Sequence, residues 1–335
     1  MLKDYQNDGP LPGFCRAAAP GPSMLPRQNT VDTPYMVGPV HYYSTERAGE
    51  LILFDTGPPT DVGRQHLQQH LDLAKLKHVI VTHCHIDHFG QVAWLEQQSD
   101  ATIYLPHRDI MKAKNHELRM AKLAGFFVDM GFEKRFLDLF HDSFQRGVSP
   151  PFPENYLVAE TDIPARLGLE VLSCPGHSQS DLVYSAEGWA VTGDTLLRGI
   201  FQSPLLDVDF ETGARFKNYE AYCSSIVKLA GLREMTVLPG HRKMIESVDA
   251  TILFYIRKTL RRVQQLLPYI SDLSVAEIIG QVFPTMTDPF RIYLKTSEII
   301  FMQEFLEYPE LLGAALREIG LFDAVAGDYN QVVSS

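Results

Sequence analysis

Four potential metal ligands lie close together near residue 85, and their types and spacing suit a pair of divalent ions. Segment 82–90, THCHIDHFG, contains His83, His85, Asp87 and His88. Imidazole nitrogens and carboxylate oxygens are common ligands of divalent transition metals. A chance match to His-x-His-x-Asp-His in a chain of this length has odds on the order of one in a thousand. The segment therefore predicts a metal centre.

A buried strand is expected just before these ligands, because residues 78–81 (HVIV) are apolar and largely β-branched. The ligands would then lie where the strand ends and a turn begins. His83 and His85 are two residues apart and can point the same way, whereas Asp87 and His88 come from the turn and can face a neighbouring ion. One strand end supplies only part of such a centre, so further ligands must come from other strands.

Three later segments share one form, an apolar strand that runs into a turn carrying a potential ligand. The strands are predicted at residues 169–174, 189–192 and 235–238, and the ligands that follow them are His177, Asp194 and His241. Each segment taken alone is more simply explained as a turn with an exposed side chain. Their joint appearance after three strands favours a shared metal centre.

With these motifs in place, residues 34–246 resemble the metallo-β-lactamase-fold hydrolases. Five motifs of that superfamily occur in order: LFDTG at 53–57, the 83–88 cluster, PGH at 175–177, GDT at 193–195 and PGH at 239–241. The resemblance implies an α/β fold, a metallo-β-lactamase-like αββα sandwich.

The resemblance also implies a role for each candidate ligand. The first ion would be held by His83, His85 and His177, and the second by Asp87, His88 and His241. Asp194 would bridge the two ions, so Asp87 and Asp194 would be the carboxylates of the catalytic centre. Asp55 would orient a ligand histidine, the alternative being a simple Asp-Thr-Gly turn.

The implied activity is that of a dinuclear metallo-hydrolase. Two ions lower the pKa of bound water, and the resulting hydroxide would attack a thioester, ester or lactone carbonyl. Zinc is the expected metal, and iron or manganese suits the same residues. The stretch 175–184, PGHSQSDLVY, is similar to one in the glyoxalase II-like and acyl-coenzyme A thioesterase-like members that end in a helical segment. A mononuclear iron persulfide dioxygenase, an RNA phosphodiesterase and a non-catalytic regulator remain alternatives.

Arg242 and Lys243 depart from the family pattern, in which a small residue commonly follows the last histidine. Four further basic residues follow, at Arg257, Lys258, Arg261 and Arg262. They form either a solvated helix face or a patch that binds the phosphates of an acyl-coenzyme A substrate.

The expected partner is a small-molecule substrate, and a homodimer is possible. The formal net charge of −11 argues against general nucleic-acid binding. No apolar run approaches membrane-spanning length and the start lacks the apolar stretch of a signal peptide, so a cytoplasmic location is the default expectation. The four cysteines, Cys15, Cys84, Cys174 and Cys223, show no CxxC pairing and are expected to be reduced.

The chain divides by pattern into an irregular N-terminal arm (1–33), a catalytic domain (34–246) and a helical C-terminal extension (247–335). The extension should cover an edge of the sandwich. Within the domain, residues of about 107–151 form a helical insertion of two helices rich in Met and Phe. These side chains could form a satellite core, against the domain or a partner subunit, and some of them could line an apolar pocket over the metals; the two interpretations are compatible.

Overall fold

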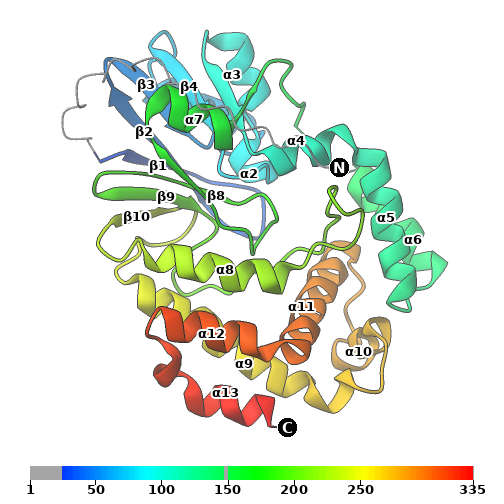
Figure 1. The fold of residues 1–335 in the computed structure, drawn as a ribbon. Helices are drawn as coiled ribbons and strands as arrows, with labels where there is room; N and C mark the ends of the chain where they lie inside the picture. The colour runs from blue at the N-terminus through cyan, green and yellow to red at the C-terminus, as the bar shows by residue number, and fades with distance from the viewer. Residues whose placement is uncertain (1–24, 147–149, 335) are drawn as a thin grey trace, which may run out of the picture.

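Two β-sheets form the centre of the computed structural model, which describes residues 25–146 and 150–334 (Figure 1). The first sheet has the order β1 (Arg27–Val31), β2 (Val40–Arg47), β3 (Glu50–Phe54), β4 (Leu76–Ile80), β5 (Thr102–Leu105) and β6 (Leu157–Val158). The second has the order β10 (Thr236–Pro239), β9 (Trp189–Gly193), β8 (Leu182–Ala186) and β7 (Glu170–Ser173). Both sheets are mixed. Strands β3, β4, β5 and β6 run parallel to one another, as do β9 and β10, and the other neighbouring pairs are antiparallel.

Alternate side chains of β3 pack into two different apolar clusters, one on each face of the first sheet. Ile52 and Phe54 point into the cluster between the sheets, where the Phe54 ring lies 5.7 Å from that of Trp189. Leu51 and Leu53 point the other way, into a cluster that joins the first sheet to its covering helices. A strand buried on both faces is apolar at successive positions for this reason.

Helices cover the outer face of each sheet. α1 (Asp61–His70) and α3 (Val92–Gln98) contribute Leu67, Val92 and Leu95 to the cluster on the first sheet. α8 (Asn218–Ala230) packs with the second sheet in a separate cluster. Two further helices, α2 (Ile86–Phe89) and α7 (Ala159–Leu167), follow β4 and β6. The predicted αββα sandwich is confirmed.

The insertion contains three helices, not the two that the sequence predicts. They are α4 (His107–Lys114), α5 (His116–Asp129) and α6 (Lys134–Arg146). The chain leaves helical geometry at Asn115, where φ is −117° and ψ is 32°, and this separates α4 from α5. Four insertion side chains are buried together with Leu206, Val208 and Tyr293, namely Met120, Leu123, Phe127 and Phe140. For these four the satellite core is the arrangement found.

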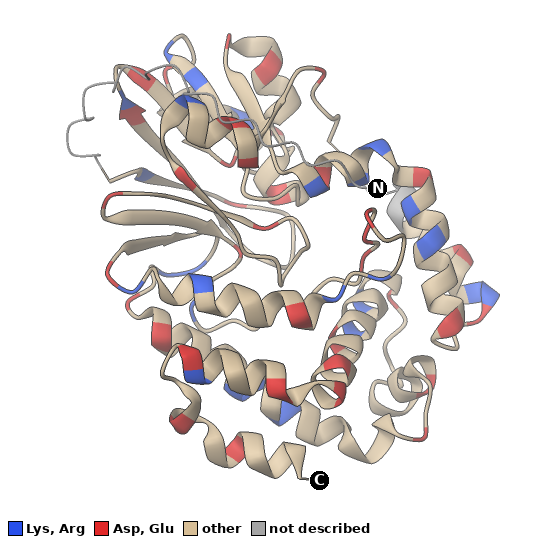
Figure 2. Cartoon of the chain, in the orientation of Figure 1, with Lys and Arg blue, Asp and Glu red and all other residues tan. Residues whose placement is uncertain are grey.

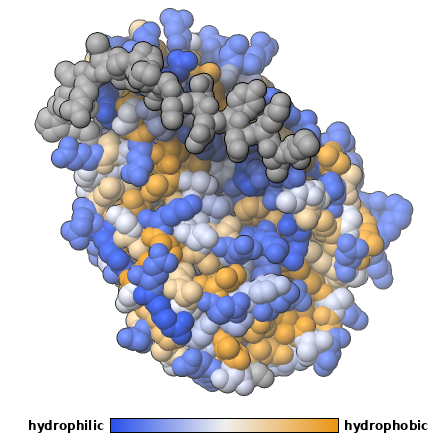
Figure 3. All heavy atoms as spheres, viewed as in Figure 1, coloured by the Kyte–Doolittle hydropathy of each residue, from blue (hydrophilic) through white to orange (hydrophobic). Residues whose placement is uncertain are grey.

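The C-terminal extension packs on α8 instead of covering an edge of the sandwich. It comprises α9 (Val248–Ile270), α10 (Val275–Val282), α11 (Pro289–Glu307), α12 (Pro309–Glu318), the 3-10 turn η1 (Phe322–Ala324) and α13 (Ala326–Val333). Helices α9, α11 and α12 all contact α8, and their apolar residues join the cluster on the second sheet. On the face seen in Figure 3, apolar residues also gather at the surface over these helices, at the bottom of the view.

The N-terminal arm predicted for residues 1–33 is wrong at residues 27–31. There β1 pairs antiparallel with β2, and it buries Asn29 and Val31 on alternating positions. Period-two burial over five residues was too short to stand out beside the Pro- and Gly-rich segment. Residues 1–24 lie outside the described residues. In the described part of the chain, no helix combines the length and apolar character needed to cross a membrane.

Candidate metal centre

Parallel strands bring the candidate ligands to one edge of the sandwich. Asp55 follows β3 and His83 follows the neighbouring parallel strand β4. Asp194 follows β9 and His241 follows its parallel neighbour β10. Because neighbouring parallel strands end at the same edge, these side chains meet there. His177 joins them from the loop after β7.

The first group of ligand atoms consists of three imidazole nitrogens. His85 Nδ1 lies 2.8 Å from His83 Nε2 and 3.1 Å from His177 Nε2. The other ring nitrogen has a partner in two of these residues: His83 Nδ1 lies 3.1 Å from the Thr82 hydroxyl, and His177 Nδ1 donates to the Ser203 carbonyl oxygen at 2.8 Å. In His83 and His177 the nitrogen that faces the group is therefore the one free to donate a lone pair.

The second group combines one carboxylate with two imidazoles. Helix α2 carries Asp87 and His88, and His241 Nε2 lies 3.1 Å from Asp87 Oδ2. His88 Nδ1 donates to Asp55 Oδ2, and His241 Nδ1 donates to the Pro39 carbonyl oxygen, both at 2.8 Å. Asp55 thus does more than form a turn, because its carboxylate fixes the orientation of a candidate ligand.

Asp194 lies between the two groups and turns one carboxylate oxygen toward each. Its Oδ2 is 3.8 Å from His177 Nε2, while its Oδ1 is 3.4 Å from His88 Nε2 and 3.7 Å from His241 Nε2. All seven candidate ligands from the sequence are therefore brought together. They form overlapping sets that could each hold an ion.

The donor atoms fit divalent ions in two respects. Within the described residues, His88 Nε2, Asp194 Oδ1 and His241 Nε2 are buried and accept or donate no hydrogen bond. Each such atom costs roughly 1–3 kcal/mol unless it is satisfied. The measured separations of 2.8–3.8 Å also bracket the spacing of roughly 3.3 Å expected between ligand atoms around a tetrahedral zinc ion.

The two groups differ in their electrostatics. Burial, reinforced by the neighbouring imidazoles, lowers the pKa of His83 well below its usual value and that of His85 to about 3. Burial would also lower the pKa of His88 and His241, but nearby carboxylates outweigh it and raise both pKa values, Asp55 foremost for His88 and Asp194 for His241. His83 and His85 therefore favour the neutral form, whereas His88 and His241 favour the protonated form and would exchange a proton for a metal ion.

Two glycines allow the ligands to approach one another. A side chain at Gly240 would lie 2.6 Å from His88 Cε1 and 2.7 Å from Asp194 Oδ1. Gly193 has a φ of +48°, and a side chain there would lie 2.5 Å from the Thr82 hydroxyl oxygen. Close packing thus explains why the Gly-Asp-Thr motif and the second Pro-Gly-His motif have glycine at these positions.

A buried ion-paired network behind the first group has no motif in the sequence. Asp109 of α4 accepts the Cys84 backbone N–H at 2.7 Å and the Ser180 hydroxyl at 2.6 Å, and it pairs with Lys112. The Cys84 side chain packs with the apolar cluster on the first sheet, as strand-like alternation predicts. The insertion therefore supports the ligand loop through its polar residues, which composition did not reveal.

Two of the four basic residues of α9 bind other parts of the protein. Arg257 donates to the Ala324 carbonyl oxygen at 3.0 Å, and Arg262 pairs with Glu298 at 2.8 Å. Arg242 and Lys243, beside His241, are exposed. Figure 2 shows charges of both signs spread along the helices. These contacts favour a structural role for Arg257 and Arg262 over a phosphate patch.

Comparisons with known proteins agree with this architecture. A family model described as the metallo-beta-lactamase superfamily matches residues 36–241. The Bacillus subtilis (strain 168) protein named "Probable metallo-hydrolase YqjP" is 26% identical over 300 residues, covering 84% of this chain and 92% of the relative.

Two solved structures are similar over most of the chain. One is a metallo-beta-lactamase family protein from Thermus thermophilus, with a TM-score of 0.66 and 22% identity, covering 85% of this chain and 94% of that one. The other is a beta-lactamase domain protein from Burkholderia ambifaria, with a TM-score of 0.67 and 22% identity, covering 87% and 88%. At this identity the similarity shows the shared fold, including the region beyond residue 241.

Proposed function

The chain belongs to the metallo-beta-lactamase superfamily, and on that premise we propose that it is a dinuclear metal-dependent hydrolase of a thioester, ester or lactone. The observation that carries the proposal is the placement of Asp194, whose two oxygens face two separate groups of ligand atoms. A carboxylate in this position can bridge two ions held side by side.

The residues divide the work of holding two ions. His83, His85 and His177 would hold the first, Asp87, His88 and His241 the second, and Asp194 both. When bound, two divalent ions supply an activated water as nucleophile and a Lewis acid for the carbonyl oxygen. Asp55, Pro39 and Ser203 accept the N–H of ligand rings, which fixes the tautomer that turns a lone pair toward the centre. Zinc suits this set best, and iron or manganese fits the same donors.

Of the three substrate classes, a thioester has least need of a proton donor for its leaving group. A thiol has a pKa of about 8.5, so a thiolate can leave without being protonated, unlike an alkoxide. This supports a thioester as the first substrate class to test, with esters and lactones next.

Exposed apolar side chains near His241 support an apolar acyl group. Pro39, which accepts a hydrogen bond from His241, follows a loop in which Met36 is 67% exposed and Val37 is 38% exposed. Met244, three residues after His241, is 37% exposed. Four large apolar residues of the insertion, Met120, Leu123, Phe127 and Phe140, are instead buried in a separate cluster. The rim beside the second group is therefore a better candidate acyl surface than the insertion.

An activity panel on the purified chain tests this function. One apolar acyl group would be offered as a coenzyme A thioester, a glutathione thioester, a simple ester and a lactone, to metal-free and zinc-loaded protein. We expect zinc-dependent hydrolysis, fastest on a thioester. Oxygen consumption with a persulfide, cleavage of RNA, or inactivity on every substrate would favour the dioxygenase, the phosphodiesterase or the regulator in its place.

A further inference from the structure

We propose that segment 201–206 and Glu298 of α11 are positioning residues for His177, so that the C-terminal helices set how tightly the first group binds metal. The inference rests on the proposed metal-dependent function. It concerns residues outside the motifs that resemble the family.

On the side of the metal centre, segment 201–206 contacts two candidate ligands. The Ser203 carbonyl oxygen accepts the His177 Nδ1–H at 2.8 Å, and the Leu205 N–H donates to the His177 carbonyl oxygen at 2.9 Å. The Gln202 side chain donates to the backbone carbonyl oxygen of Asp194. The segment therefore holds both the ring and the backbone of His177, and it also holds the backbone of the bridging residue.

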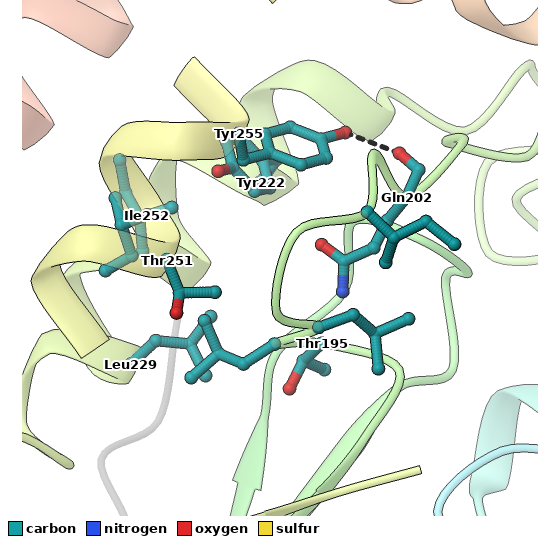
Figure 4. A pocket seen from close by; sticks show the side chains of 11 residues that line it. Thr195, Gln202, Tyr222, Leu229, Thr251, Ile252 and Tyr255 are labelled. Carbon is teal, nitrogen blue, oxygen red and sulfur yellow. Dashed lines mark hydrogen bonds between the residues drawn. The ribbon is translucent and has the colours of Figure 1, made fainter. Parts of the chain in front are cut away.

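On its other side, the same segment is bonded to two C-terminal helices. The Ser203 hydroxyl donates to Glu298 at 2.9 Å, and the Leu206 N–H donates to the Ser297 hydroxyl at 2.9 Å. The Tyr255 hydroxyl of α9 donates to the Gln202 carbonyl oxygen at 2.8 Å, the dashed contact in Figure 4. Segment 201–206 thus links α9 and α11 to His177, so a shift of either helix would move a ligand of the first group.

Glu298 is itself fixed by two cations. Its side chain is 7% exposed; it accepts a hydrogen bond from Lys295 and forms an ion pair with Arg262, each at 2.8 Å. Both cations approach Oε2, whereas the Ser203 hydroxyl binds Oε1. A buried carboxylate held in this way is a stronger and more directional acceptor than a neutral group, so it can fix the rotation of the Ser203 backbone.

Packing leaves the segment no room to move toward the helices. The cavity between Gln202, Tyr222 and Tyr255 has a volume of about 10 Å³ (Figure 4), which is close to the smallest space that holds one water molecule. The Phe201 ring stacks on Tyr255 with the centroids 4.6 Å apart, and the Arg262 guanidinium lies 3.9 Å from the Phe201 centroid. The position of the Ser203 carbonyl is therefore set by the helices.

Ser203→Ala in the full chain tests the inference, because it removes one hydroxyl and leaves the carbonyl that His177 uses. The affinity of each of the two zinc ions would be measured by competition with a chelator, and the cobalt-substituted protein would report ligand geometry by its absorption spectrum. We expect one ion to bind roughly 10- to 100-fold more weakly while the other is unchanged, as for other outer partners of metal ligands. Ser203→Thr, which keeps a hydroxyl, should restore the affinity, and Ser224→Ala on the exposed face of α8 is the matched control.

A double variant separates positioning from general destabilisation. If Ser203 and Glu298 act along one chain of contacts, adding Glu298→Gln to Ser203→Ala should weaken the first ion no further. Unchanged zinc affinity in Ser203→Ala, or equal weakening of both ions, would overturn the inference. A wild-type chain that binds a single ion would instead refute the dinuclear proposal, and loss of that ion in Ser203→Ala would still support the role of Ser203.

Discussion

The two halves of the metal centre contain similar imidazoles but are supported in different ways. In the first, His177 rests on the carbonyl oxygen of Ser203, and both His85 and His177 are partly exposed. In the second, every ligand is buried, and His88 rests on the carboxylate of Asp55. A neutral carbonyl fixes a ring without charging it, whereas a buried carboxylate also stabilises its protonated form.

The difference teaches how one site can treat two chemically similar ions unequally. In the first half the pKa values of His83 and His85 are lowered, and the contacts of segment 201–206 link the position of His177 to the distant helices α9 and α11. The second half has its own negative charge, from Asp87 and Asp55, and depends on nearby strand ends. We therefore expect the first half to respond to changes in the C-terminal helices, and the second half to changes in pH and charge.

The largest effect should come from removing what the two halves share. Asp194→Asn keeps the shape of the side chain but removes the charge that faces both groups. Hydrolysis should fall on the order of a thousandfold, which corresponds to roughly 4 kcal/mol of lost transition-state stabilisation. Steady-state kinetics checks this, with circular dichroism as the control for folding. Activity within tenfold of wild type would show that Asp194 does not bridge.

A smaller and unequal effect is expected from Asp55→Asn. Asp55 binds His88 directly, whereas it reaches His83 only through the Thr82 hydroxyl, at 2.9 Å and then 3.1 Å. The second ion should therefore bind roughly 10- to 100-fold more weakly and the first ion should lose less. Stepwise zinc titration measures both. An equal loss of affinity for the two ions would contradict the proposed difference between the halves.

The pH dependence of metal binding should also separate the halves. Carboxylates raise the pKa of His88 and His241, so an ion entering the second half must displace up to two protons, and its affinity should rise as pH rises toward those values. The pKa values of His83 and His85 are lowered, so these ligands release no proton near neutrality. Calorimetric titration at about pH 6 and about pH 8 in two buffers counts the released protons. The same proton count for both ions would contradict the assignment.

The smallest effect should come from Cys84→Ala. Cys84 lies between two candidate ligands in sequence, but its side chain packs with the apolar cluster on the first sheet. Activity and metal content should change by no more than about twofold, as for a substitution away from the reacting groups. Loss of zinc would mean that the thiol faces the metals.

The sequence predicts the side chains of the centre better than it predicts what holds them. His83 and Asp194 are found because ligands after strands leave a pattern of residue types. Ser203 and Pro39 act through backbone carbonyls, which every residue has, so no pattern marks them. Asp109 lies in a helix with no motif around it, and only the packing of α4 brings it to Cys84.

Packing also decided the parts of the fold that the sequence left open or misplaced. The apolar side chains of the insertion suit either a pocket or a core, and the choice depends on where α11 presents Tyr293. Arg262 fits a basic patch by its sequence neighbours alone, but α11 brings Glu298 beside it. Such partners are separated along the chain, so local patterns carry no signal of the contact.

The most direct test of the dinuclear centre is the metal content of the purified full-length chain after mild dialysis, measured by elemental analysis together with protein concentration. Two ions per chain are predicted for the wild type, because Asp194 faces two complete groups of ligands. A reproducible content of one ion, or none, in protein that is folded and zinc-supplemented would contradict the account.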